Sequence, residues 1–293
     1  MADALFDKDF LKKLEYLDLI ARRLIFGRPQ ALRASVKKGA SIEFKDFREY
    51  SPGDDPRTVD WAVYARLGEL VIKLYRQEEE LDLWILLDGS GSMTFGEPSK
   101  FDHARRIAAA LAYIGMSNMD SAGVVPFSAD LKTGRTRMRG RGKVFGLLEY
   151  LQQLRPDGRT DLVSMSRAFV SRVRRPSLIV ILSDFYGLQS ARRALDQLRF
   201  FKHQLYVIQM TSAWELDPPI RGELRLQDSE SSEIEDLTIT DSMLRRYKQE
   251  YDRFGKDLRA YSMRHAIGYA QTRSDTAFDN FIRDILQRGG LLS

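Results

Sequence analysis

The stretch WILLDGSGSM, residues 84–93, joins a buried strand to a polar loop. Its first four residues are apolar without a break, which is typical of a strand covered on both faces. Asp88 follows, and glycine and serine then alternate for four residues. Glycine lets this backbone turn sharply and approach a neighbouring segment closely. Because side chains alternate along an extended chain, the spacing predicts that Asp88, Ser90 and Ser92 point to one side of the loop.

Helices and strands alternate along the chain after this stretch. A second unbroken apolar run, LIVILSD at residues 178–184, predicts another buried strand that ends in aspartate. This alternation predicts an α/β fold, a doubly wound and mostly parallel sheet with helices on both faces. The expected strands lie at residues 81–87, 123–127, 131–138, 178–184, 204–209 and 267–271, and the expected helices at 99–118, 143–154, 161–174, 190–200, 241–264 and from 276 onward.

The N-terminal region predicts one helix followed by irregular chain. Apolar residues at a 4-3-4-3 spacing from Phe10 predict an amphipathic helix that ends at Gly27. Residues 28–68 are rich in Arg, Asp, Gly and Pro and contain only short β-like pieces. A charge network in this segment could serve either as a buttress for the N-terminal region or as a partner site.

The segment before the first core strand predicts how the N-terminal region is attached. Residues 70–75 and 81–87 resemble two neighbouring strands joined by an acidic turn at 77–80. The N-terminal region has too few apolar residues for a core of its own. The expected organisation is therefore a helix and β-containing extension, residues 1–79, docked on a sheet domain, residues 80–293.

One insertion interrupts the alternation of strands and helices. Residues 214–240 include GELRLQDSESSEIEDLTI, which predicts a β-hairpin with an acidic, serine-rich turn. Such an excursion is either a tolerated surface loop or a binding element. The residues of the hairpin do not decide between these two interpretations.

The composition excludes several classes of protein and site. No apolar run approaches the roughly 18 residues of a membrane span, and the charged N-terminus lacks the apolar core of a signal peptide. We therefore expect a cytoplasmic protein without a transmembrane segment. The chain has no cysteine, and its 3 histidines are far apart in the sequence. Any metal ligands are thus expected to be oxygens, which favours Mg²⁺, Mn²⁺ or Ca²⁺ over zinc or copper.

The charge distribution does not indicate a nucleic-acid-binding protein. The net charge is only +5, from 46 basic and 41 acidic residues. The basic stretch RTRMRGRGK, residues 135–143, could contact phosphate, but it also fits an exposed edge strand whose cations discourage pairing with other chains. We favour the edge strand, because it lacks the aromatic residues and motifs of a nucleic-acid interface.

Five oxygen-bearing side chains are predicted to meet at one edge of the sheet. Ligands of a doubly wound sheet bind beyond the carboxyl ends of the strands, where the strand order reverses. If the strands that end at Asp88 and Asp184 flank this reversal, the two carboxylates face one crevice, and the loop PDGRTD at 156–161 adds a threonine. Hydroxyls, one or two carboxylates and waters suit a small, hard cation. We therefore expect Mg²⁺ or Mn²⁺, in preference to Ca²⁺, at Asp88, Ser90, Ser92, Thr160 and Asp184.

This three-part pattern resembles the metal-ion-dependent adhesion site of von Willebrand factor A domains. The shared elements are Asp-x-Ser-x-Ser after an apolar strand, a later loop threonine, and an aspartate that ends another apolar strand. The resemblance implies that Ser90 and Ser92 bind the metal directly, and Thr160 directly or through water. It implies that Asp88 and Asp184 act mainly through waters. In such domains the open coordination position accepts a carboxylate from a partner protein.

The resemblance covers roughly residues 80–290 and has one departure at the site. Phe185 follows Asp184 where many von Willebrand factor A domains have glycine. A von Willebrand factor A-like, Rossmann-type sheet with an N-terminal extension and a β-hairpin insertion is the fold that the resemblance implies.

A longer stretch resembles the bacterial domain-of-unknown-function family 58. Residues 43–93, EFKDFREYSPGDDPRTVDWAVYARLGELVIKLYRQEEELDLWILLDGSGSM, match its pattern before an adhesion-type domain, and LDPPIRGELRLQDSES at 216–231 matches its insertion. Many relatives carry N-terminal membrane helices, which this sequence lacks. Members are commonly associated with MoxR-type AAA+ ATPases. The resemblance therefore implies an adaptor or chaperone component that works with such an ATPase.

Two functions from different classes fit these residues. The first is a metal-dependent protein-binding module whose cation takes an Asp or Glu from a partner protein. The second is a Mg²⁺-dependent hydrolase, such as a phosphatase with Asp88 as nucleophile. A common aspartate phosphatase would have a second Asp two residues later as general acid, and here that residue is Ser90. The sequence therefore favours binding over catalysis and predicts a protein that is not an enzyme.

Overall fold

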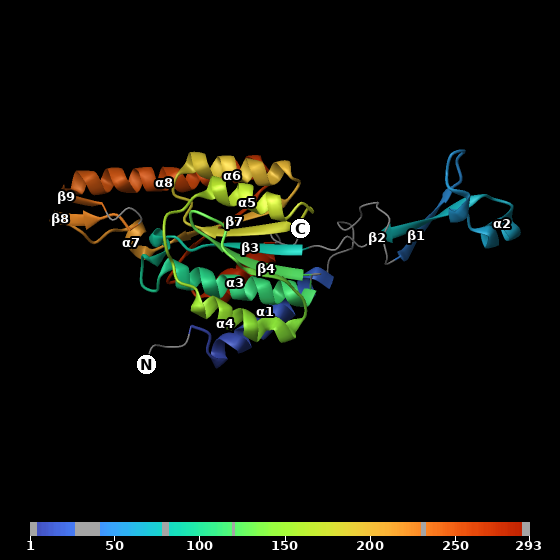
Figure 1. Ribbon diagram of the computed structural model, residues 1–293, viewed down its shortest axis with the longest axis horizontal. Coiled ribbons are helices and arrows are strands. Elements are labelled where there is room, and N and C mark those ends of the chain that lie inside the picture. Colours follow the sequence, from blue (N-terminus) through green and yellow to red (C-terminus); the bar gives the residue numbers. More distant parts are fainter. Residues whose placement is uncertain (1–4, 27–41, 78–81, 119–120, 230–232, 289–293) are drawn as a thin grey trace. The chain divides into compact units, whose positions relative to one another are not determined.

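The chain forms two compact units, one of which holds the predicted sheet (Figure 1). The larger unit comprises residues 1–27 and 81–293, and the smaller comprises residues 28–80. The computed structural model describes residues 5–26, 42–77, 82–118, 121–229 and 233–288. The predicted turn at 77–80 lies largely outside the described residues.

The larger unit is built on a six-stranded sheet in the order β10-β7-β6-β3-β4-β5. Neighbouring strands are parallel except at one edge, where β5 runs antiparallel to β4. The predicted doubly wound and mostly parallel sheet is therefore confirmed. The strands are β3 (Asp82–Asp88), β4 (Ser121–Phe127), β5 (Arg135–Met138), β6 (Leu178–Ser183), β7 (Gln204–Thr211) and β10 (Gly268–Arg273).

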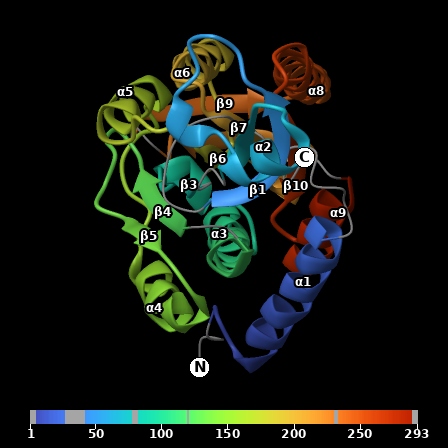
Figure 2. The same cartoon turned by 90° about the vertical axis from the view of Figure 1, so that its right-hand side faces the viewer.

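Helices cover both faces of this sheet, which explains the unbroken apolar runs of the central strands (Figure 2). Leu83, Ile85 and Leu87 pack in one cluster with residues of α1, α3, α4 and α9. Trp84 and Leu86, which alternate with them, pack in a second cluster with residues of α5, α6 and α8. The helices are α1 (Lys8–Phe26), α3 (Lys100–Asn118), α4 (Val144–Gln153), α5 (Leu162–Arg172), α6 (Leu188–Phe200), α8 (Asp241–Arg264) and α9 (Phe278–Arg288).

Two surface elements follow the sequence prediction. The basic stretch forms the edge strand β5, whose residues are mostly exposed, as the edge-strand interpretation predicts. The insertion contains a short helix, α7 (Ala213–Leu216), and then an antiparallel hairpin of β8 (Gly222–Gln227) and β9 (Ile234–Ile239). The predicted hairpin is therefore confirmed, and its strands form a two-stranded sheet separate from the main one.

The predicted pairing of residues 70–75 with the first core strand is wrong. Strand β2 (Val71–Gln77) pairs antiparallel with β1 (Ile42–Glu49), while β3 has β4 on one side and β6 on the other. Both edges of β3 are thus occupied by strands that are buried on both faces. The docking of residues 28–79 on the sheet domain stays a prediction.

The smaller unit also contains elements that the irregular sequence does not announce. A 3₁₀ turn, η1 (Pro56–Thr58), precedes the helix α2 (Trp61–Leu67). The Asp60 carboxylate caps α2 by accepting hydrogen bonds from two backbone amides, those of Ala62 at 3.0 Å and Val63 at 3.3 Å. Gly68 ends the helix in the left-handed conformation, with φ of 70°. Several acidic residues of this segment therefore serve turns and helix ends.

Helix α1 belongs to the core of the larger unit although residues 28–80 separate it from β3. Phe10, Leu14 and Leu17 form its buried stripe, which faces α3 and α9. The Phe10 and Phe278 rings lie 4.8 Å apart between centroids. Further along α1, the side-chain amide of Asn118, the last residue of α3, donates to the buried Asp18 carboxylate at 2.7 Å. The helical part of the extension is thus packed on the sheet domain.

We expect Leu14→Ala to lower the free energy of unfolding of the sheet unit by about 2–5 kcal/mol, because it opens a cavity in a filled core. Leu14 is 1% exposed, whereas Leu19 on the same helix is 58% exposed. Leu19→Ala is the matched control and should change stability by less than about 0.5 kcal/mol. Urea unfolding followed by circular dichroism measures both, and equal effects would contradict the packing of α1 on the core.

Candidate metal-ion site

The predicted crevice lies at the carboxyl edge of the central strands. Strand β3 ends at Asp88, and its parallel neighbour β6 ends at Ser183, one residue before Asp184. In the sheet, β4 lies beside one edge of β3. Strand β6, which comes later in the chain, lies beside the other edge of β3. The strand order therefore reverses between β3 and β6, where doubly wound sheets bind their ligands.

Asp88 lies at the centre of a set of short polar contacts. Its side chain is fully buried, and the Ser183 hydroxyl donates to its Oδ2 at 2.6 Å. The Thr160 hydroxyl lies 3.2 Å from each carboxylate oxygen, and the Ser90 amide donates to Oδ1 at 3.0 Å. Three separate segments of the chain thus supply donors to one buried carboxylate, as a desolvated charge requires.

The loop after β3 is held in place by backbone hydrogen bonds to its neighbours. The Gly89 amide donates to the Phe127 carbonyl at 2.8 Å, and the Gly91 amide donates to the Gly158 carbonyl at 2.8 Å. The Asp157 amide donates to the Gly89 carbonyl at 2.7 Å. These bonds join the loop to the segment that carries Thr160.

The two serines of the loop bring their hydroxyls together. Ser90 Oγ and Ser92 Oγ lie 3.1 Å apart. Ser90 is fully buried, whereas Ser92, in the 3₁₀ turn η2 (Gly91–Thr94), is half-buried. The pair therefore offers adjacent oxygen donors at the outer side of the Asp88 carboxylate.

Asp184 is bonded to a buried lysine that sequence reasoning missed. Lys100 Nζ lies 2.8 Å from Asp184 Oδ2 and also pairs with the Glu215 carboxylate. The Tyr186 hydroxyl donates to Glu215 Oε1 at 2.9 Å. Lys100 is fully buried at the first turn of α3, where a lysine is unfavourable beside the positive end of the helix dipole. Two features of the sequence could have pointed to this ion pair: the lysine at a helix start, and the Ser-x-x-Glu capping pattern of residues 212–215 that contains Glu215.

Phe185 adopts the backbone conformation that would suit glycine. Its φ of 59° lies in the left-handed region, and its side chain is buried in the cluster under α5 and α6. Burial of the ring offsets the strain of a left-handed non-glycine residue, which is on the order of 1–2 kcal/mol. Phe185 thus holds a left-handed backbone conformation for which glycine is the usual residue.

The electrostatics of the crevice leave Asp88 short of positive charge. Burial and the nearby Asp184 carboxylate together raise the pKa of Asp88 to about 7, against the hydrogen bonds from Ser183 and Ser90, which lower it. Burial alone would lower the pKa of Lys100, but the carboxylates of Asp184 and Glu215 outweigh it and raise the pKa. The ammonium therefore provides counter-charge on the Asp184 side of the crevice, whereas the groups that contact Asp88 in the described part of the chain are hydroxyls and a backbone amide, which carry no positive charge.

The residues present fit a small divalent cation bound by oxygens. A buried carboxylate with a raised pKa, two adjacent serine hydroxyls and a threonine hydroxyl are the kind of donors that Mg²⁺ and Mn²⁺ accept. Across the described ranges, no group of three or more His, Cys, Asp or Glu side chains could hold a metal by itself. Any metal site here therefore depends on hydroxyl donors, as the sequence predicts.

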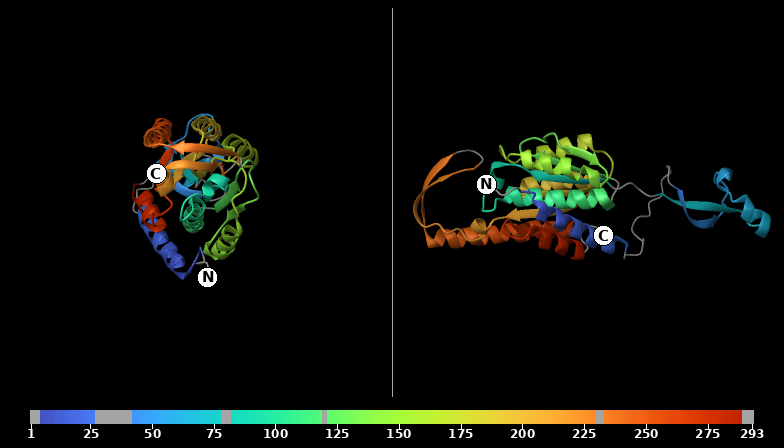
Figure 3. Two further views of the ribbon diagram at one scale, coloured as in Figure 1. Left: turned by 90° about the vertical axis from the view of Figure 1, so that its left-hand side faces the viewer. Right: turned by 90° about the horizontal axis from the view of Figure 1, so that it is seen from below.

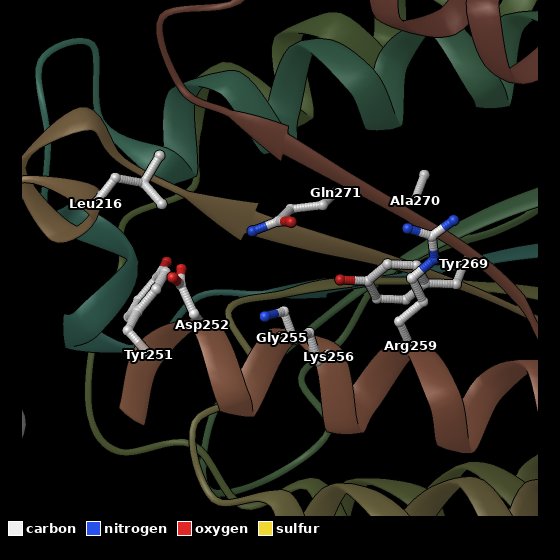
Figure 4. A pocket seen from close by; sticks show the side chains of 9 residues that line it. All are labelled: Leu216, Tyr251, Asp252, Gly255, Lys256, Arg259, Tyr269, Ala270 and Gln271. Atoms are coloured by element: carbon white, nitrogen blue, oxygen red, sulfur yellow. The ribbon is translucent and has the colours of Figure 1, made fainter. Parts of the chain in front are cut away.

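A separate cavity lies outside this crevice. A pocket of ≈ 410 Å³ lies between α8 and β10. Figure 4 shows Tyr251, Lys256 and Arg259 of α8 on one side and Tyr269 and Gln271 of β10 on the other. None of the five predicted metal-binding residues lines it.

Replacing Lys100 should strongly destabilise the protein. We expect Lys100→Met to cost about 3–5 kcal/mol, because it leaves two buried carboxylates without their cation. The double variant Lys100→Met/Glu215→Gln removes one of these charges and should recover part of the loss. Chemical unfolding measures both variants, and equal stability of Lys100→Met and wild type would show that the ammonium does not balance the carboxylates.

Asp88 should make the metal-free protein less stable as the pH rises. Its pKa is about 7 in the folded protein against 3.8 in an ordinary carboxyl, so folding favours the protonated form. This contribution is fully present below pH ~4 and is lost as the pH rises through about 7. Asp88→Asn should remove it. We expect the urea midpoint of wild type relative to Asp88→Asn, both in EDTA, to be lower at pH 8 than at pH 5. A constant difference would contradict the raised pKa.

Among the residues that the structure describes, no helix combines the length and the apolar character that crossing a membrane requires.

Several solved structures resemble this chain at low similarity. The protein BatB of Bacteroides thetaiotaomicron matches 71% of this chain and 98% of its own, with a TM-score of 0.41 and 16% identity. The manganese-loaded TRAP protein of Plasmodium vivax matches 45% of this chain and 57% of its own, with a TM-score of 0.36 and 19% identity. These likenesses carry no argument about function. The strand order and the helix layers by themselves establish the predicted α/β fold class, a doubly wound and mostly parallel sheet.

Sequence comparison assigns the chain to a family. An uncharacterized protein of Mycobacterium bovis is 27% identical over 238 residues, which cover 80% of this chain and 75% of that protein. A protein of Mycobacterium tuberculosis, also described as uncharacterized, matches to the same extent. The family profile "Protein of unknown function DUF58" matches residues 46–260, which is most of the chain. The chain therefore belongs to the DUF58 family.

Proposed function

We propose that this chain is a metal-dependent protein-binding module. Asp88, Ser90, Ser92, Thr160 and Asp184 hold a Mg²⁺ or Mn²⁺ ion at the carboxyl edge of β3 and β6. The observation that carries this proposal is the buried Asp88 carboxylate, which has a raised pKa and hydroxyl neighbours, while the ammonium of Lys100 pairs instead with Asp184 and Glu215. A divalent ion supplies the missing charge.

The contacts suggest how these residues share the ion. Ser90 and Ser92 place adjacent hydroxyls at the outer side of the crevice and are the direct ligands, as in the adhesion site that the motif resembles. Asp184 has one oxygen engaged by Lys100, which suits an outer role through water. Asp88 is surrounded by protein donors and also suits an outer role.

The bound ion keeps an open position for a partner. Lys100 neutralises Asp184, so only one unpaired carboxylate, that of Asp88, faces the cation. A divalent cation bound mainly by hydroxyls retains positive charge, and it attracts an anionic oxygen from outside. The partner is therefore a protein that presents an exposed Asp or Glu. A MoxR-type AAA+ ATPase in the same complex, and an adaptor or chaperone role, are proposed from the family resemblance alone.

Binding is favoured over hydrolysis by the groups around Asp88. The other carboxylate of the crevice is bonded to Lys100. The buried His103 contacts the hydroxyl of Thr272 on β10, and burial lowers its pKa to about 4. Neither Asp184 nor His103 is therefore placed as the general acid that an aspartyl phosphatase needs.

We expect titration calorimetry of the metal-free protein with Mn²⁺ to show one site, and the heat to vanish in Ser90→Ala/Ser92→Ala. Loss of both hydroxyls removes the direct ligands. The control is Ser171→Ala/Ser190→Ala, which deletes two hydroxyls that bond to carbonyls of their own helices. That variant should bind as wild type does. Equal heats from the two double variants would exclude the serines as ligands.

The partner itself can be tested by affinity capture from the native cell. We expect capture of a protein that is released by EDTA and absent with Ser90→Ala/Ser92→Ala bait, and a MoxR-type ATPase in the same eluate. The Ser171→Ala/Ser190→Ala bait controls for the loss of two hydroxyls. Capture that resists EDTA and the metal-site variant alike would show that docking does not use the ion.

A further inference from the structure

The β8–β9 hairpin contacts the loop that carries the two serines. A Cβ built on Gly91 would lie 2.3 Å from the main-chain oxygen of Ser229, which follows β8. Real Cβ contacts are essentially never this short, so the hairpin backbone lies directly against the glycine. Gly91 is held from the other side by its hydrogen bond to Gly158. In Figure 3, right, the orange hairpin strands curve back toward the teal segment that follows β3.

The hairpin is otherwise weakly held. Its two strands pair with each other through six residue pairs and form a sheet of their own. Of the strand residues, only Ile239, at the base of β9, is buried. The ion pair between Arg225 and Asp236 lies within the hairpin and is largely exposed. Elements with so few buried apolar contacts open at low free energy. The hairpin can therefore leave the loop without disturbing either core cluster.

The base of the insertion also contacts the metal-ion site. Glu215, in α7, is joined through Lys100 to Asp184. Beside it, the half-exposed Trp214 ring meets the half-exposed Phe95 ring edge to face, with centroids 6.2 Å apart. Phe95 directly follows η2. The insertion thus approaches the site at both its base and its outer end.

The charge of the hairpin determines what kind of partner this face fits. Glu223 and Glu235 are exposed carboxylates, one on each strand. The carboxylates of an acidic segment beside a cation site compete with a partner's carboxylate for the cation. They also attract basic side chains of the partner. A partner carboxylate flanked by Lys or Arg therefore matches both the ion and the hairpin.

We propose that the β8–β9 hairpin is the resident occupant of the partner-binding face: it lies across Gly91 in the free protein, and a partner displaces it. The displacing segment is an acidic residue flanked by basic side chains. This inference rests on the proposed function, because the face is defined by the metal-ion site. Partner engagement is thereby coupled to a movement of the insertion.

The contact can be tested without metal by hydrogen exchange read by mass spectrometry. Gly91→Ala adds the Cβ that meets Ser229, while its other near contact, the Gly158 oxygen at 3.6 Å, is ordinary. Gly89→Ala is the matched control, since its Cβ would meet atoms only at 3.6 Å and 3.7 Å. In EDTA we expect amides of residues 222–229 and 233–239 to exchange about tenfold faster in Gly91→Ala, and at the wild-type rate in Gly89→Ala. Unchanged exchange in Gly91→Ala would overturn the inference.

The covering of the site can be tested with Mn²⁺ as a paramagnetic probe. A variant with residues 223–238 replaced by Gly-Gly-Ser keeps the paired ends Gly222 and Ile239. We expect water-proton relaxation by bound Mn²⁺ to be larger in this variant than in wild type. A 12-residue peptide whose only charged side chain is one Asp should also bind the shortened variant more tightly, by about tenfold, since it no longer displaces the hairpin.

The two tests separate the failure of this inference from that of the proposed function. If Mn²⁺ binds neither the wild type nor the shortened variant, the metal-ion proposal fails, while hydrogen exchange still decides the hairpin contact. If Mn²⁺ binds both with equal water access and equal peptide affinity, the site exists but the hairpin does not cover it, and the inference is overturned.

Discussion

A carboxylate buried at the end of the central strand determines the surroundings of the crevice. Removing Asp88 from water is costly unless donors or a cation replace the lost solvation. The structure supplies donors from β6, from the loop after β3 and from the segment before α5. These three segments are thereby drawn to one point. The same convergence places the serine hydroxyls at the edge where the strand order reverses.

The second carboxylate of the crevice, Asp184, is stabilised differently, by the ammonium of Lys100. This lysine brings a full positive charge to Asp184 and shares it with Glu215, whereas Asp88 is contacted by uncharged donors. This asymmetry distinguishes the two aspartates, which look equivalent in the sequence. It also ties the first turn of α3 and the base of the insertion to the same site, so the geometry of the crevice depends on elements far apart in the chain.

The parts of the fold that follow from periodicity were predictable, and those that depend on distant pairing were not. Unbroken apolar runs identified β3 and β6, because strands covered on both faces leave a continuous signal. The convergence of Asp88 and Thr160 followed from the general geometry of such sheets. The partner of β2 could not be predicted, because a strand pattern does not specify its neighbour. The partners of Lys100 could not be predicted either: a lysine at a helix start is unusual, but it does not indicate which carboxylates on other segments it contacts.

The arrangement of α1 has a consequence for how the chain folds during synthesis. Its apolar stripe is completed by α3 and by α9, and its Phe10 ring lies against Phe278 near the other end of the described chain. When α1 emerges from the ribosome, α3 and α9, which cover the stripe, have not yet been synthesised. The stripe therefore stays exposed, available to chaperones or to other nascent chains, until most of the polypeptide has emerged. Such long-range closure slows folding, and it makes the sealing of the N-terminal helix one of the last steps in forming the core.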